Sequence, residues 1–294
     1  MAKIKYVEFL FIVILAFALF SCEEEIEWDA EEVEEMLVVE GSFTNELKHH
    51  RVTLTKTAPY FSDKETPAVE NADIFITSKS DTITFSESPD EPGEYVTDEI
   101  TAGETGTTYM LHIDLESPIN GQKSYYAKET MVPGLVMTNL DAFIYENPVY
   151  VEESGMDSLM LIVTIYGQEP KEIENNYMVK LRKNQEPMHD TISQVGIYTD
   201  EQEFEAEYAN NLFFFDGFLP GDTLELELSS VTDHFRDYVD GVQKLANQSG
   251  NPFDLSGPPA NALGNIQGAE AMGYFRVSSV SKSATIIQDG REED

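Results

Sequence analysis

The chain has 294 residues, of which 55 are acidic and 18 are basic, giving a formal net charge of −37 at pH 7, and it contains a single cysteine, Cys22. A field of this sign repels nucleic acid and anionic lipid headgroups, so the charge excludes nucleic acid as a partner. A single cysteine excludes an internal disulfide, so the fold must depend on the burial of apolar side chains, for which the chain is long enough.

Residues 1–21 have the pattern of a secretory signal peptide. Two lysines, Lys3 and Lys5, precede an unbroken apolar run of 12 residues at 9–20 (FLFIVILAFALF). A membrane-spanning helix needs roughly 20 such residues, so the run favours a signal peptide over a spanning anchor.

Residues 19–22 (LFSC) resemble a bacterial lipobox, with Leu three positions before the cysteine and a small residue directly before it. That resemblance implies that Cys22 becomes the first mature residue and carries acyl chains such as palmitate. Each buried methylene contributes about 0.8 kcal/mol, so two or three acyl chains on one cysteine anchor a protein stably. The alternative is a free thiol in the core, which the neighbouring acids disfavour.

An acidic segment follows the cysteine. Nine of the 14 residues at 22–35 are Asp or Glu, beginning with Glu23, Glu24 and Glu25. Such a segment repels itself and buries little apolar surface, so it predicts an extended, solvated tether. The same acids resemble the surface-export signal of Bacteroidetes-type lipoproteins, which implies display on the outer face of the outer membrane. A tether without an export role, and a periplasmic location, are the alternatives.

Residues 36–133 predict a domain of short strands. Apolar and polar side chains alternate in HRVTLTKTA (50–58), and this period of two is typical of a half-buried strand. We expect strands at 36–40, 50–58, 72–78, 81–88, 93–98, 108–115 and 125–132. Short strands separated by turn residues, with no helix among them, predict an immunoglobulin-like antiparallel β-sandwich.

Residues 134–288 predict a second β-rich domain, and MVPG (131–134) marks the junction. We expect strands at 140–145, 157–167, 176–183, 211–217 and 222–231, with a closing strand at 272–280. The stretch SLMLIVTIY (158–166) is apolar on both faces, which is typical of a strand covered on both sides. Residues 289–294 form a polar tail.

One amphipathic helix is predicted near 232–248, before a Pro- and Gly-rich loop at 251–265. The expected apolar stripe consists of Phe235, Tyr238, Val239, Val242 and Leu245. Thr232 is the expected N-cap, and Gly250 is expected to end the helix.

No catalytic or cofactor constellation emerges from the sequence. His49 and His50 are expected on opposite faces of a strand, which is unsuited to one metal site. Residues 279–282 (SVSK) match an S-x-x-K motif by spacing only. Acidic clusters at 90–94 and at Asp233, Asp237 and Asp240 could hold Ca²⁺, but neither follows the calcium-loop spacing, which favours solvated acids. We expect no enzyme activity, no cofactor and no metal.

Several stretches, in their order along residues 36–280, are similar to an uncharacterised Bacteroidetes lipoprotein family, a domain of unknown function. They are LVVEG (37–41), VTLTKTAPYF (52–61), GEY (93–95), NPFD (251–254) and GYF (273–275). The resemblance implies genes beside those of TonB-dependent outer-membrane receptors, and it implies no catalytic residue.

Together with Cys22 and the acidic tether, this similarity predicts a lipid-anchored accessory or binding protein of the cell surface, working with a TonB-dependent receptor in nutrient capture or uptake. A surface adhesion or matrix-binding module is the alternative. A glycan-acting enzyme is less favoured, because it requires two carboxylates at a set separation across a cleft.

Overall fold

The computed structural model describes residues 35–58, 66–79, 81–146, 158–170, 175–188, 191–200, 208–214, 217–247 and 262–291. The chain from Glu35 to Asp294 forms one compact unit. Cys22 and the acids Glu23, Glu24 and Glu25 lie outside the described residues. Among those described, no helix combines the length and the apolar character that crossing a membrane requires.

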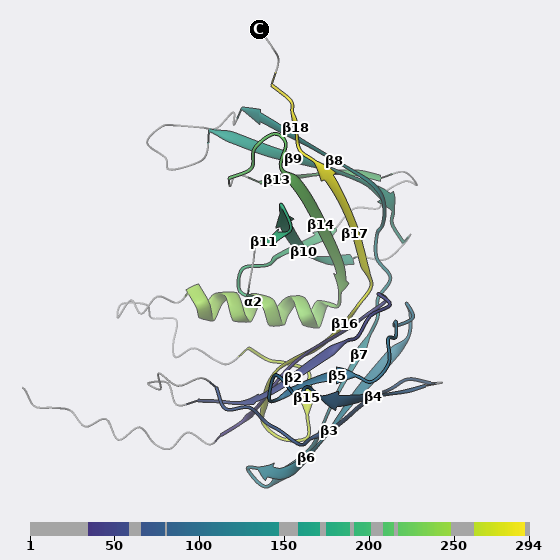
Figure 1. Cartoon of the computed structure of the whole chain (residues 1–294), viewed down its shortest axis with the longest axis vertical. Coiled ribbons are helices and arrows are strands. Elements are labelled where there is room, and N and C mark those ends of the chain that lie inside the picture. Colours follow the sequence, from purple (N-terminus) through teal and green to yellow (C-terminus); the bar gives the residue numbers. More distant parts are fainter. Residues whose placement is uncertain are drawn as a thin grey trace, which may run out of the picture. The chain divides into compact units, whose positions relative to one another are not determined.

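Within the described residues the strands form three sheets (Figure 1). The largest has nine strands in the order β15-β7-β6-β3-β4-β5-β2-β1-β16. Its strands are β1 (Leu37–Thr44), β2 (Arg51–Lys56), β3 (Asp73–Thr77), β4 (Thr82–Glu87), β5 (Glu94–Thr97), β6 (Thr108–Ile119), β7 (Gln122–Thr130), β15 (Ile266–Gln267) and β16 (Ala271–Ser278). Most neighbours are antiparallel, but β1 and β16 are parallel.

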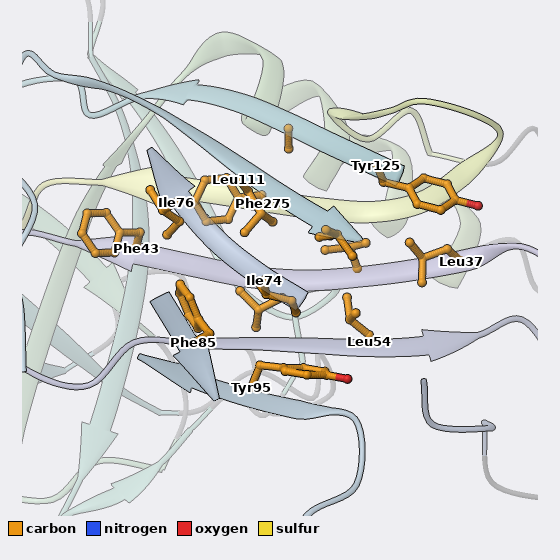
Figure 2. Close-up of a cluster of buried hydrophobic side chains, with 14 of the residues drawn as sticks. Leu37, Phe43, Leu54, Ile74, Ile76, Phe85, Tyr95, Leu111, Tyr125 and Phe275 are labelled. Atoms are coloured by element: carbon orange, nitrogen blue, oxygen red, sulfur yellow. The ribbon is translucent and has the colours of Figure 1, made fainter. Parts of the chain in front are cut away.

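The core of the nine-stranded sheet comes almost wholly from one of its faces. In β2, Val52 and Leu54 are fully buried while Arg51 is exposed, as alternation predicts. Figure 2 shows Phe43, Phe275 and other side chains of this cluster, from strands far apart in the sequence. A single sheet encloses this core, so the nine-stranded sheet curls on itself.

The two edges of this sheet meet at one end. Val132, just after β7, forms a parallel bridge with Ser278, the last residue of β16. The expected mainly β fold with one amphipathic helix is confirmed, but the arrangement is not clearly an immunoglobulin-like sandwich. The seven strands expected in residues 36–133 all form, yet they join one sheet, which β15 and β16 complete from late in the chain.

The other two sheets pack face to face. One has four strands, β13 (Tyr208–Phe214), β9 (Leu159–Gln168), β8 (Val136–Glu146) and β18 (Gln288–Asp289). The other has five, with β11 (Glu186–Pro187), β10 (Asn175–Lys183), β14 (Thr223–Val231) and β17 (Val280–Ile286) in that order and β12 (Gly196–Asp200) paired with β10. Leu161 and Val163 of β9 meet Leu226 of β14 in the shared core. The opposite face of β9 is partly exposed, with Tyr166 at 36%, so the expected cover on both sides is incomplete.

The helix α2 (Asp233–Asn247) forms where the sequence predicts it. Thr232 is its N-cap, because its Oγ1 accepts the Phe235 N–H at 3.3 Å. Phe235 and Val239 are buried and pack against Met178 of β10 and Tyr274 of β16. The expected end at Gly250 lies outside the described residues. The helix therefore fills the space between the five-stranded sheet and β16.

The expected domain boundary between residues 133 and 134 lies where the chain passes from β7 to β8 and thus changes sheet. Later, β16 returns to the nine-stranded sheet, and Ser279 alone separates it from β17 of the five-stranded sheet, a path that Figure 1 draws in yellow. These two consecutive strands connect the sheets covalently.

Candidate functional site

The outer face of β16 carries the polar groups of the candidate site. Phe275 and Val277 point into the core of the nine-stranded sheet, so alternation places Tyr274, Arg276 and Ser278 on the opposite face. Tyr274 packs against Phe235 of α2, with ring centroids 4.9 Å apart. Arg276 Nη1 lies 3.9 Å from the sulfur of Met178, on β10.

A row of charged side chains crosses the adjacent five-stranded sheet. Lys180 of β10 lies opposite Glu227 of β14, which lies opposite Lys282 of β17. Lys282 Nζ is 3.0 Å from Glu227 and 2.8 Å from Glu46, a residue of the loop between β1 and β2. Lys48, from the same loop, also contacts Glu46. Residues of three strands and of the β1–β2 loop thus share one network.

We call this network, together with Arg276, the cation cluster. It consists of Lys48, Lys180, Arg276, Lys282, Glu46 and Glu227, which all interact electrostatically. Four cations face two carboxylates here, in a chain where acids outnumber bases by 55 to 18. The cluster is therefore locally positive within a strongly negative protein.

The two carboxylates are well neutralised. Burial acts to raise the pKa of Glu46, but hydrogen bonds from Lys282 and Lys48 outweigh it and lower that pKa to about 2. Burial likewise opposes ionisation of Glu227, and the bond and charge of Lys282 overcome it, so its pKa is also lowered. Both carboxylates are ionised at neutral pH, and Lys282 forms an ion pair with each of them.

Lys180 and Arg276 are not neutralised in this way. Neither has a carboxylate oxygen within 4.0 Å in the part of the chain that the structure describes. Burial lowers the pKa of each group, and the charge of Arg276 lowers that of Lys180 further, whereas the charge of Glu227 partly opposes burial at both groups. Arg276 instead lies over the ring of Phe235, with its guanidinium carbon 5.8 Å from the ring centroid.

A second polar network begins at Tyr274. Its hydroxyl donates to Glu129 of β7 at 2.5 Å, and Asn265 donates to the same carboxylate oxygen at 3.5 Å. His234 Nδ1 lies 3.0 Å from the Tyr274 oxygen. Because Tyr274 gives its only proton to Glu129, His234 must donate through Nδ1. Burial, reinforced by Glu129, raises the pKa of Tyr274, which stays neutral. The network links α2 to β7 through β16.

The two histidines considered at the sequence level take structural roles. His50 is 1% exposed, with Nδ1 accepting from the Thr44 N–H at 3.4 Å and Nε2 donating to the Thr101 carbonyl at 3.0 Å. Burial lowers the pKa of His50, consistent with a neutral ring. His49 Nδ1 lies 2.7 Å from the Thr97 carbonyl oxygen. Both rings are thus engaged with backbone groups.

The remaining sequence candidates do not assemble into one site. Arg236 separates Asp233 and Asp237, at 2.9 and 3.0 Å, so these acids have a counter-ion. Ser279 donates to the Val132 carbonyl while Lys282 binds two glutamates, so the S-x-x-K residues do not act together. In the described ranges, no three His, Cys, Asp or Glu side chains are grouped to hold a metal ion.

Sequence reasoning missed the cation cluster. Its members come from the β1–β2 loop, β10, β14, β16 and β17, and no spacing in the sequence relates them. One signal was present: Lys180 interrupts the apolar stretch YMVKL (177–181) of a strand whose other positions nearby are buried.

A family model described as "Domain of unknown function (DUF4249)" matches residues 23–284. No curated protein matches the sequence.

Proposed function

This chain belongs to the DUF4249 family, and we propose that it is a lipid-anchored binding protein of the outer cell surface, working with a TonB-dependent receptor in nutrient capture or uptake. The observation that carries the proposal is the order of segments: an apolar signal, Cys22 in a lipobox, nine acids, and then the folded unit. The family match begins at Glu23, one residue after Cys22, which supports a mature chain that starts at the cysteine.

The start of the folded unit supports a tether with a defined exit. Glu35 is 3.1 Å from Lys56 Nζ, and its carbonyl accepts from Asn120 in the β6–β7 turn at 2.8 Å. The chain at 22–34 has 13 residues, which span at most about 45 Å when extended. Glu35 would then lie no farther than that length from the membrane surface.

The polar groups of the two networks described above are engaged within the protein, which favours a binding role over catalysis for them. Glu129, Tyr274 and His234 hold elements together, and the carboxylates Glu46 and Glu227 are committed to lysines. A hydrolytic enzyme needs an activated nucleophile or a free acid–base pair. A protein that captures and passes on a nutrient needs only a surface or a site of the right charge and shape.

Replacing Cys22 with Ala is expected to leave the protein unlipidated and to move it from the membrane fraction to the soluble fraction. The variant has no thiol to carry acyl chains, and the 12-residue apolar run is too short to hold the protein as a membrane-spanning anchor. Fractionation of cells with mass measurement of the mature chain checks this. Ser21→Ala, which keeps a small residue before the cysteine, is the matched control and should stay anchored.

Wild-type protein, pulled down from detergent-solubilised outer membranes, should bring a TonB-dependent receptor with it, whereas Cys22→Ala should bring much less. Repeated recovery without any receptor would remove the partner from the proposal.

If Cys22→Ala still fractionates quantitatively with membranes at the mass of the processed wild type, the lipid anchor is wrong.

Exchanging Glu23, Glu24 and Glu25 for Gln is expected to leave lipidation and folding intact but to keep the protein facing the periplasm. A neutral polar linker is also flexible, so an effect on location would come from an export role and not from the tether's extension. Protease added to intact cells should degrade the wild type and spare the triple variant. The control is the same exchange at Glu31, Glu32 and Glu34, which keeps the acids next to the cysteine. Equal digestion of wild type and triple variant would exclude the export role.

A further inference from the structure

The strongest unexplained feature of the described unit is a pair of cations, Lys180 and Arg276, that form no ion pair within 4.0 Å in the described ranges. Both are half-buried, and in this chain acids outnumber bases by 55 to 18. A partly desolvated charge without a counter-ion is costly, and natural proteins usually pair such groups. The nearest carboxylates, Glu227 and Glu46, attract these cations but form their ion pairs with Lys282. Lys180 and Arg276 therefore have capacity to bind an external anionic group.

The two cations are close enough to act on one ligand. Arg276 Nη1 contacts the sulfur of Met178, which lies two residues before Lys180 on the same face of β10. Same-face neighbours on a strand are about 7 Å apart. The flexible side chains of Lys180 and Arg276 can therefore converge on a small group above this part of β10.

A third group on the same face has no partner. Ser278 follows Arg276 by two residues on the outer face of β16, is 0% exposed, and its Oγ makes no hydrogen bond within the described part of the chain. Buried hydroxyls without a partner are rare in folded proteins. A hydroxyl can donate to an anion, so Ser278 extends the set of donors that begins with Arg276.

We propose that Arg276 and Lys180 bind the oxyanion group of a small soluble molecule, a carboxylate or a phosphate, with Ser278 as a further donor and Met178 and Phe235 as an apolar wall. Guanidinium and oxyanion geometries match in a bidentate manner. The ligand is small because the net charge of −37 repels a polyanion from the protein as a whole. Lys282, 37% exposed, lies at the solvent side of the cluster.

This inference deepens the proposed binding function by naming the class of nutrient, and it rests on that function. The ligand class does not depend on the lipid anchor or the receptor. The ligand proposal and the anchoring proposal can therefore fail separately. The test uses the full mature protein purified in detergent, with inorganic phosphate and succinate as probes, each compared with chloride at equal ionic strength. The variants are Lys180→Met and Arg276→Met, and the matched control is Lys128→Met, which removes an exposed lysine of β7.

At a probe concentration ten times its Kd, mass action predicts a rise in the thermal midpoint of about 3–5 °C for wild type and Lys128→Met. Lys180→Met and Arg276→Met should lose the rise, with Kd increased at least about tenfold in titration calorimetry. A rise with phosphate alone assigns a phosphate ligand, and a rise with succinate alone assigns a carboxylate. If Arg276→Met does not fold, Lys180→Met carries the test.

Two results would overturn the proposal. The first is a thermal midpoint that is the same with either probe as with chloride, at a probe concentration of about 10 mM. A probe that does not bind at that concentration has a very low affinity, even for a small molecule. The other is an equal rise in wild type, Lys180→Met and Lys128→Met, which would indicate non-specific binding to the surface. Release of the protein from membranes, or loss of the receptor, would change neither readout.

Discussion

Replacing Gly273 with Ala is expected to lower the free energy of unfolding by about 3 kcal/mol or more. Gly273 has a φ of +89°, which residues with a Cβ rarely adopt. A Cβ at this position would also lie 2.0 Å from the carbonyl oxygen of Val39 and 2.8 Å from its carbonyl carbon. These are backbone atoms of β1, so they cannot rotate away, and the parallel pair of β1 and β16 would have to separate.

Denaturant unfolding followed by circular dichroism measures this loss. Gly196→Ala is the matched control, because a Cβ there meets nothing within 4 Å and the backbone is not left-handed. Its free energy of unfolding should stay within about 0.5 kcal/mol of the wild type. A Gly273→Ala variant as stable as Gly196→Ala would show that β16 does not pair with β1 as described.

Replacing Tyr274 with Phe is expected to lower the free energy of unfolding by about 2–3 kcal/mol. Glu129 is 9% exposed and has no basic side chain within ion-pair distance in the described ranges. The Tyr274 hydroxyl supplies its shortest hydrogen bond, at 2.5 Å, whereas Asn265 is 3.5 Å away. Phe keeps the ring that packs on Phe235, so the loss reports the two hydrogen bonds of the hydroxyl, to Glu129 and from His234.

The same unfolding measurement applies, and a double-mutant cycle isolates the interaction. In a Glu129→Gln background the further cost of Tyr274→Phe should fall by at least half, because the acceptor is no longer charged. Tyr126→Phe, at a residue 41% exposed on β7, is the control and should change the free energy of unfolding by less than about 0.5 kcal/mol. Equal costs in both backgrounds would contradict a specific Tyr274–Glu129 bond.

Strands and helix were predictable where side-chain periodicity was strong. Alternation in residues 51–56 and the apolar stripe of α2 each determine which side chains are buried, and both elements formed as expected. β17 was missed because SVSKSAT (279–285) is mostly small and polar, without an apolar face. The two-residue strands β11, β15 and β18 are too short to carry any period.

The signal peptide, the lipobox and the acidic tether are predicted from consecutive residues. Such motifs depend on the local order of residues along the chain and not on contacts between distant segments. The burial pattern of most strands is equally local, since alternation fixes which face of a strand is apolar. Alternation does not say which strand lies beside which. Only the tertiary structure pairs β1 with β16 across more than 200 residues, where Leu37 is in register with Ala271. The same pairing places Arg276 above β10 beside Lys180, so the cation cluster exists because non-local strand pairing, and not sequence spacing, brings its charges together.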